Sequence, residues 1–292
     1  MIELQGVSSI AAVKPTLWGL TLLLVTAGPS SVGASDVEPP ESTSDLPNHA
    51  FTLESGFGGY DAGEQEVQSL RLPFSFTPRS LEEHPWGLKL RLPISLWLYS
   101  VDLPDFLEGL NLDNVSAIAL VPEAEFRIPV SRRWMLKPYV KAGVAKDFAG
   151  GDLIFVGGTG LKGLYTHPLK TTILSFGSAV KYDISHSSGG LNNDDFASIE
   201  VGLDAGRPLG FSFGDRRAEG SLYVIARNFF RNLTFQQVTG RTLIVEQLYE
   251  VGLTFGTSPR PMLWKLSLPR FGVGYRFGEN FRGVRLFLGF PF

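Results

Sequence analysis

The sequence predicts an all-β protein, a closed antiparallel transmembrane β-barrel of about twelve strands. Three observations lead to this fold class. Apolar residues recur at every second position along most of the chain, which is typical of strands and not of helices. Several alternating segments run well past the roughly five or six residues usual for strands of soluble sheets. The composition, with 33 Gly, 22 Phe and 43% hydrophobic residues, favours strands joined by tight turns.

Charge and cysteine content exclude several classes of function. The 26 basic and 29 acidic residues give a net charge of −3, without the basic excess expected of a protein that binds nucleic acid. The absence of cysteine excludes disulfides, cysteine-ligated zinc, iron–sulfur clusters and thiol catalysis. His49, His84 and His167 are isolated and lack the spacing of metal ligands. We therefore expect no cofactor, no metal and no nucleic-acid partner.

The first segment of the chain predicts export. The apolar run Leu17–Ala27 follows Lys14 and is shorter than the roughly 20 residues needed to span a bilayer. Together with the small residues behind it, this layout is typical of a secretory signal peptide over residues 1–34, the alternative being an uncleaved N-terminal anchor. Residues 35–50 are acidic, contain prolines and lack periodicity, which predicts a flexible leader. The barrel is expected over residues 51–292.

The alternation is clearest in Leu88–Leu98, where Leu or Ile occupies every second position. A similar pattern runs through Leu243–Phe255 and through Val284–Phe292. Clusters of Gly, Pro, Asn and Asp then mark the boundaries between strands. The strands are predicted near 51–59, 67–77, 86–100, 115–130, 134–148, 152–166, 170–186, 196–211, 218–234, 241–257, 263–277 and 281–292.

Strand length favours a membrane barrel over a soluble sandwich. In a membrane barrel the apolar positions face lipid and the polar positions line the lumen. An apolar, alternating final strand suits such a barrel, because the last strand must pair with the first to leave no open edge in lipid. The terminal aromatics Phe290 and Phe292 also resemble the C-terminal signal that outer-membrane proteins present to the barrel-assembly machinery. We therefore expect an integral outer-membrane protein whose partners are outer-membrane lipid and, during biogenesis, that machinery.

Two stretches carry a resemblance to a known family. The tail Leu268–Phe292 (LPRFGVGYRFGENFRGVRLFLGFPF) looks like the end of the solitary outer-membrane autotransporter-like β-barrel family. The segment Leu120–Tyr139 (LVPEAEFRIPVSRRWMLKPY) resembles the middle strands of that family. The resemblance implies a twelve-stranded barrel related to autotransporter translocators, without the large secreted passenger. It implies no catalytic residue.

The charged side chains on the polar positions predict the contents of the lumen. Both signs appear in similar numbers, so a network of ion pairs across the lumen is expected, which argues against a wide general porin. The alternative is a narrow selective channel lined by the same residues. The residues expected to line the lumen are Lys89, Arg91, Glu123, Glu125, Arg127, Lys137, Lys141, Glu246, Glu250 and Arg285.

One local motif suggests a different function. His186 and Ser188 stand two residues apart at a predicted strand end, an arrangement similar to the nucleophile pair of outer-membrane phospholipase A and lipid A deacylase. Glu200 is the acidic residue at the matching spacing, but its alternation places it in the lumen while the pair faces lipid. A polar, Gly-rich turn explains the same residues without catalysis. The sequence therefore favours a structural or interaction barrel, or a narrow pore, with an outer-membrane lipid hydrolase as the alternative.

Overall fold

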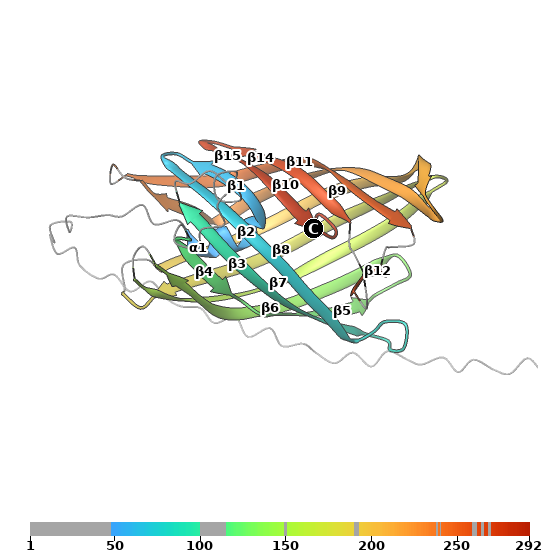
Figure 1. Ribbon diagram of the computed structural model, residues 1–292, viewed down its shortest axis with the longest axis horizontal. Coiled ribbons are helices and arrows are strands. Elements are labelled where there is room, and N and C mark those ends of the chain that lie inside the picture. The colour runs from blue at the N-terminus through green and yellow to red at the C-terminus, as the bar shows by residue number, and fades with distance from the viewer. Residues whose placement is uncertain are drawn as a thin grey trace, which may run out of the picture. The chain divides into compact units, whose positions relative to one another are not determined.

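The computed structural model describes residues 48–99, 115–148, 151–189, 193–237, 239, 241–258, 262–263, 266–267 and 270–292. The predicted signal peptide, and the predicted leader apart from residues 48–50, lie outside these ranges. The described residues form a closed antiparallel β-barrel of twelve strands with one short helix (Figure 1). The all-β, closed antiparallel part of the sequence prediction is thereby confirmed.

The strands follow one another around the ring in chain order. β4 and β5 share one position, because both pair with β3 on one side and with β6 on the other. β1 pairs with β2 and with β15 and so closes the ring. The strands of the ring are β1 (Phe57–Ala62), β2 (Gln65–Arg79), β3 (Gly87–Tyr99), β4 (Ala117–Leu120), β5 (Glu123–Pro129), β6 (Trp134–Asp147), β7 (Leu153–Leu169), β8 (Thr172–Ser187), β9 (Asn193–Phe213), β10 (Arg216–Gln236), β11 (Thr242–Ser258), β14 (Phe271–Gly278) and β15 (Phe281–Leu288). β12 (Met262–Leu263) and β13 (Leu266–Ser267) form a separate pair.

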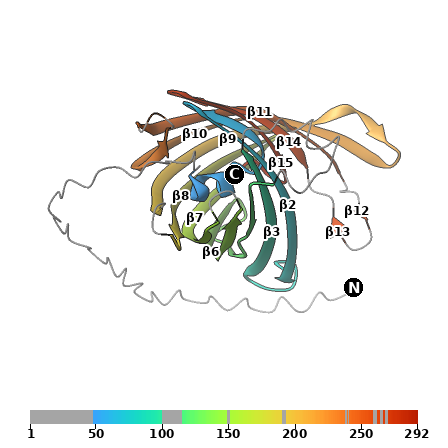
Figure 2. The same ribbon diagram turned by 60° about the vertical axis from the view of Figure 1, so that its left-hand side comes forward.

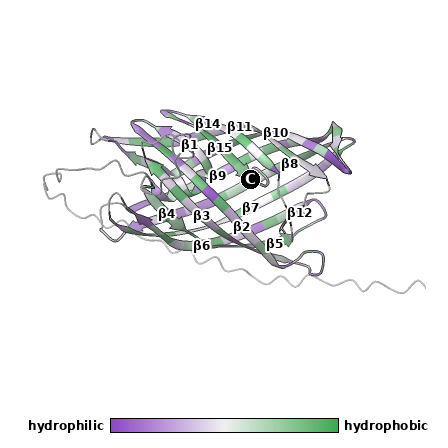
Figure 3. Cartoon of the chain, viewed as in Figure 1, coloured by the Kyte–Doolittle hydropathy of each residue, from purple (hydrophilic) through white to green (hydrophobic). Residues whose placement is uncertain are grey.

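Side chains alternate between the two faces of the barrel wall. On β8, Phe176 and Val180 are exposed, whereas Lys181 and Asp183 are buried. Hydrophobic and hydrophilic residues consequently succeed one another along the strands in Figure 3. The outward face is therefore apolar, and the inward face is polar, over most of the ring.

The first predicted strand, near residues 51–59, is wrong in its first half. His49–Ser55 form helix α1, and β1 begins at Phe57. Asn48 caps the helix, because its side-chain oxygen accepts a hydrogen bond from the Phe51 backbone N–H at 2.9 Å. A two-turn helix is too short to display a helical period, so alternation could not distinguish it from a strand.

The last predicted strand ends earlier than expected. β15 stops at Leu288, and Gly289 follows with a φ of 119°, a backbone conformation that other residues rarely adopt. Phe292 lies against Gly177 of β8 and Gly202 of β9, where a Cβ atom on either glycine would overlap the phenyl ring. Both ribbon views place the C-terminal end of the chain within the barrel (Figure 1, Figure 2). The tail therefore crosses from β15 to the facing wall.

The two ends of the barrel differ. We call the end that holds α1 and the β1–β2 turn the helix end, because α1 contacts residues close to the tips of β10 and β15 there. We call the other end the turn end. It carries the two-residue turns Lys170–Thr171 and Gly214–Asp215.

Candidate functional site

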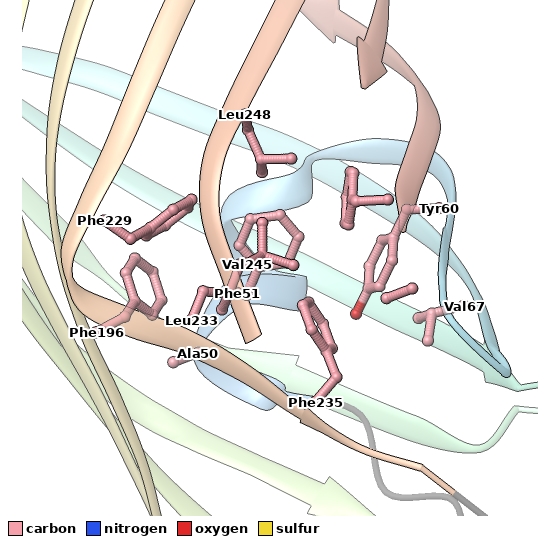
Figure 4. Close-up of a cluster of buried hydrophobic side chains, with 12 residues drawn as sticks. Ala50, Phe51, Tyr60, Val67, Phe196, Phe229, Leu233, Phe235, Val245 and Leu248 are labelled. Carbon is pink, nitrogen blue, oxygen red and sulfur yellow. The ribbon is translucent and has the colours of Figure 1, made fainter. Parts of the chain in front are cut away.

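An apolar cluster holds α1 inside the helix end of the barrel (Figure 4). Phe51 is fully buried, and its ring centroid lies 5.4 Å from that of Tyr60, 5.8 Å from that of Phe235 and 5.6 Å from that of Phe281. One helical side chain thus joins strands from both sides of the ring closure. The cluster consists of Ala50, Phe51, Tyr60, Ala62, Val67, Phe196, Phe229, Leu233, Phe235, Val245, Leu248 and Phe281.

A carboxylate at the end of α1 binds the barrel wall. Glu54 Oε1 lies 2.9 Å from the Lys141 ammonium, and Glu54 Oε2 lies 3.3 Å from the Lys181 ammonium. Arg71 of β2 adds a hydrogen bond at 2.9 Å to the Leu53 carbonyl, an acceptor at the C-terminal end of the helix. α1 is therefore fixed by apolar packing on one turn and by charge on the next.

The same two lysines also have carboxylate partners on the wall itself. Lys141 lies 2.7 Å from Asp183, and Lys181 lies 3.1 Å from Glu200. Glu200 accepts further hydrogen bonds from Arg227, whose Nε is at 2.9 Å. The three basic side chains are each less than a tenth exposed, so the network lies in a region that excludes most solvent. Removing one member of such a network leaves a buried charge without its partner.

A second network surrounds Glu250 of β11. Its carboxylate accepts hydrogen bonds from the Tyr223 hydroxyl at 2.6 Å and from Arg276 at 2.9 Å, and Arg285 contacts it at 2.6 Å. Arg285 also donates to the Pro291 carbonyl at 3.2 Å, which ties the C-terminal tail to this network. The tail and the lumen charges are thus one connected structure.

A third network lies on β3 and β5. Arg91 is ion-paired with Glu123, and it contacts Glu125 at 2.7 Å. Arg127 reaches the same Glu125 carboxylate at 3.3 Å. Lys89 and Lys137 lie on the inward alternation of β3 and β6, but no ion pair joins either lysine to a carboxylate among the described residues.

Glu246 is the member of the expected lumen set that the structure places elsewhere. The β10–β11 ladder shifts register between Asn228 and Leu233, a β-bulge. The shift reverses the alternation on β11, so Val245 is buried while Glu246 is exposed. Across this shift β10 advances five residues while β11 advances two, and strict period-two counting cannot anticipate such an interruption of the ladder.

The residues of the lipid-hydrolase alternative are separated. His186 is exposed on β8, whereas the Ser188 hydroxyl accepts a hydrogen bond from the Leu153 backbone N–H at 3.1 Å. No hydrogen bond joins His186 to Ser188 in the described part of the chain. Glu200 lies inside the lumen with Lys181 and Arg227, on the face opposite to that of His186. These side chains do not form a nucleophile, base and orienting acid.

Several lumen residues were missing from the expected set. Lys181 and Asp183 lie on the polar alternation of β8, and Arg227 lies on that of β10, so the same counting could have found them. The alternation of polar residues gives no comparable indication that Glu54 and Arg71 lie in the lumen. Their role depends on the insertion of α1, which brings residues 53 and 54 of the helix against β2, β6 and β8.

No protein-family model matches the chain, and no curated protein matches it either. In the described residues, α1 has seven residues and no helix has the length and apolar character to cross a bilayer.

Proposed function

We propose that this chain is an integral outer-membrane β-barrel with a structural or interaction role, and that its own helix α1 keeps the lumen closed. In this proposal it resembles an autotransporter translocator without a passenger. The observation that carries the proposal is the inverted distribution of side chains: ion pairs fill the lumen while large apolar side chains cover the outside.

The apolar exterior supports a lipid-facing wall. Exposed contiguous apolar surface of this extent is unfavourable in water, because each Å² of apolar area costs about 25 cal/mol. A bilayer removes that cost, and the barrel leaves few backbone groups unpaired in lipid. Exposed apolar side chains recur around the ring, among them Leu92, Phe126, Val140, Phe155, Leu161, Phe176, Val180, Ile199, Val201, Leu222, Val224, Val251, Leu253, Val273 and Val284.

The occupied lumen supports a closed barrel over an open pore. α1 joins the ring at the helix end through Phe51 and Glu54, and Phe292 crosses the lumen to Gly177. A conducting path would have to separate these contacts, whereas an anchoring or interaction barrel can retain them. A narrow pore is therefore the second candidate function, behind a closed structural or interaction barrel.

Fractionation of Gram-negative cells that express the full chain tests the membrane location. We expect the protein in the outer-membrane fraction, extracted only by detergent. On gels without boiling it should migrate as a compact species, and boiling should shift it to the mass of the unfolded polypeptide, which lies below the 32.0 kDa of the full sequence once the predicted signal peptide of residues 1–34 is removed. Recovery as a soluble periplasmic protein would overturn the proposal.

A further inference from the structure

One part of the lumen wall carries more positive than negative charge. This part lies on β3, β5, β6 and β7 toward the turn end, and we call it the basic wall. Its inward-facing charged residues are Lys89, Arg91, Arg127, Lys137 and Lys162 on the positive side and Glu123 and Glu125 on the negative side.

Both carboxylates of the basic wall are already engaged by arginine. Arg91 binds Glu123 and Glu125, and Arg127 binds Glu125 as well. Lys162 contacts a neutral group, since its ammonium lies 4.8 Å from the centre of the Tyr139 ring. Within the described ranges, Lys89, Lys137 and Lys162 have no carboxylate within ion-pair distance. The contrast is with the lumen near α1, where each buried lysine has two carboxylate partners.

The strand register places two of these lysines face to face. Lys137 of β6 lies directly opposite Lys162 of β7. Residues so paired have Cβ atoms about 5 Å apart, and like charges at that position destabilise a sheet. Electrostatically, Lys137 is attracted by Glu125 but repelled by Lys162, Arg127 and Arg91. Lys89 is likewise repelled by Arg91 and Arg127, and it is attracted by Glu125 and Glu123. Lys162 is attracted by Glu123 and Glu125 and repelled by Lys181 and Arg91. The wall therefore holds a local repulsion that a bound anion would relieve.

We propose that the basic wall binds a phosphate group between Lys137 and Lys162, with Lys89 and Arg127 adding to the positive potential around it. A phosphate carries more than one negative charge near neutral pH and several acceptor oxygens, so a single group can bridge two ammonium groups. A monovalent anion would neutralise only one. Solvent reaches the wall, since the side chains of Arg91 and Arg127 are 26% and 33% exposed. This site does not depend on the membrane location proposed above.

The test uses the full chain folded in detergent, with inorganic phosphate as the probe. Phosphate binding is measured by calorimetry, and the unfolding temperature is measured with and without phosphate. The test variant is Lys137→Gln/Lys162→Gln. The control is Lys146→Gln, which lies on the same strand β6 near the helix end. In the double variant we expect phosphate affinity to fall at least about a hundredfold, as for the loss of two charge-assisted hydrogen bonds.

The double variant should also unfold at a higher temperature than the wild type in phosphate-free buffer, because it lacks the repulsion. If the two lysines had a purely structural role, the double variant would instead unfold at a lower temperature than the wild type.

A second experiment distinguishes the source of the phosphate group. In nanodiscs, phosphatidic acid should bind in preference to phosphatidylcholine if the site takes a lipid headgroup, and only inorganic phosphate should bind if it takes a free ion. Equal binding by wild type and double variant in both experiments, or binding by neither protein, would overturn the proposal.

Discussion

At the scale of single residues, Glu54 is the carboxylate that joins α1 to two buried lysines of the barrel wall. It holds both Lys141 and Lys181, and these lysines also contact Asp183 and Glu200 on the wall. Replacing Glu54 by Gln should destabilise the barrel by about 3 kcal/mol, because two buried ammonium groups lose a carboxylate. The measurement is the urea midpoint of the shift between compact and unfolded gel species.

Glu66→Gln is the matched control for Glu54→Gln, because Glu66 is an exposed carboxylate on β2. Its urea midpoint should stay within the small range typical of surface changes, about 0.5 kcal/mol. If Glu54→Gln shifted the midpoint no more than Glu66→Gln, α1 would not be anchored by charge.

His49 should make stability depend on pH. Its ring is fully buried and stacked on Trp97 at 5.4 Å, and neither ring nitrogen has a hydrogen-bond partner in the described part of the chain. Burial lowers the pKa of His49 from 6.5 to about 4, with Asp152 opposing the shift. The unfolded chain therefore takes up the proton first. The stability contributed by neutral His49 is complete above pH 6.5 and falls by up to about 3 kcal/mol as pH drops to 4.

His49→Phe isolates this effect from the titration of other groups, because it keeps an aromatic ring over Trp97 and removes the ionisable nitrogens. The difference in urea midpoint between His49→Phe and wild type should grow as the pH is lowered from 6.5 towards 4. Parallel curves across that range would show that His49 takes up its proton at the same pH in the folded and unfolded states, so that burial does not lower its pKa.

At the scale of elements, alternation predicted the ring well and its interruptions poorly. Strands such as β8 and β9 have one apolar and one polar face, and period two reports that difference directly. α1 was missed because Ala50, Phe51 and Leu53 are all buried in a helix of seven residues. Glu246 was misplaced because a bulge reverses the faces of one strand without changing its composition.

The position of the C-terminal tail is a second feature that the sequence of the tail itself could not predict. Phe290 and Phe292 continue the alternation of β15, yet the decisive residues are Gly177 and Gly202 on distant strands, which leave room for the Phe292 ring. Gly177→Ala should cost about 1–3 kcal/mol, because the added methyl group occupies the position of the ring. The urea midpoint of the refolded protein measures this cost.

Phe292→Ala tests whether that cost arises from the tail. In a Phe292→Ala background the methyl group at residue 177 has no ring to displace, so Gly177→Ala should become nearly neutral, and the double variant should be destabilised by less than the sum of the two single variants. An unchanged cost in the two backgrounds would mean that the tail does not rest on β8 in solution.

At the scale of the whole molecule, few charges remain for the surface that faces outward. Only 19% of the residues are charged, and the mean hydropathy of the whole sequence is +0.08, so the chain is only slightly apolar on average. The outer face of the barrel can nevertheless be apolar, because charged side chains such as Lys141, Glu200 and Arg276 form ion pairs inside the ring. The sequence could predict this division from alternation alone, but which charges meet depends on shear and register around the ring.

The position of α1 in the lumen predicts how the barrel should behave in a planar bilayer. With α1 in place, Phe51 and Glu54 join the helix to several strands, so the purified wild type should show little steady conductance. Deleting residues 48–55 removes the helix but no strand of the ring, and it should produce frequent, larger conductance steps. Phe51→Ser/Glu54→Gln offers the same test with the chain length kept, in case the deletion fails to fold. An open wild-type channel whose conductance matches that of both variants would favour the narrow-pore function over a closed interaction barrel.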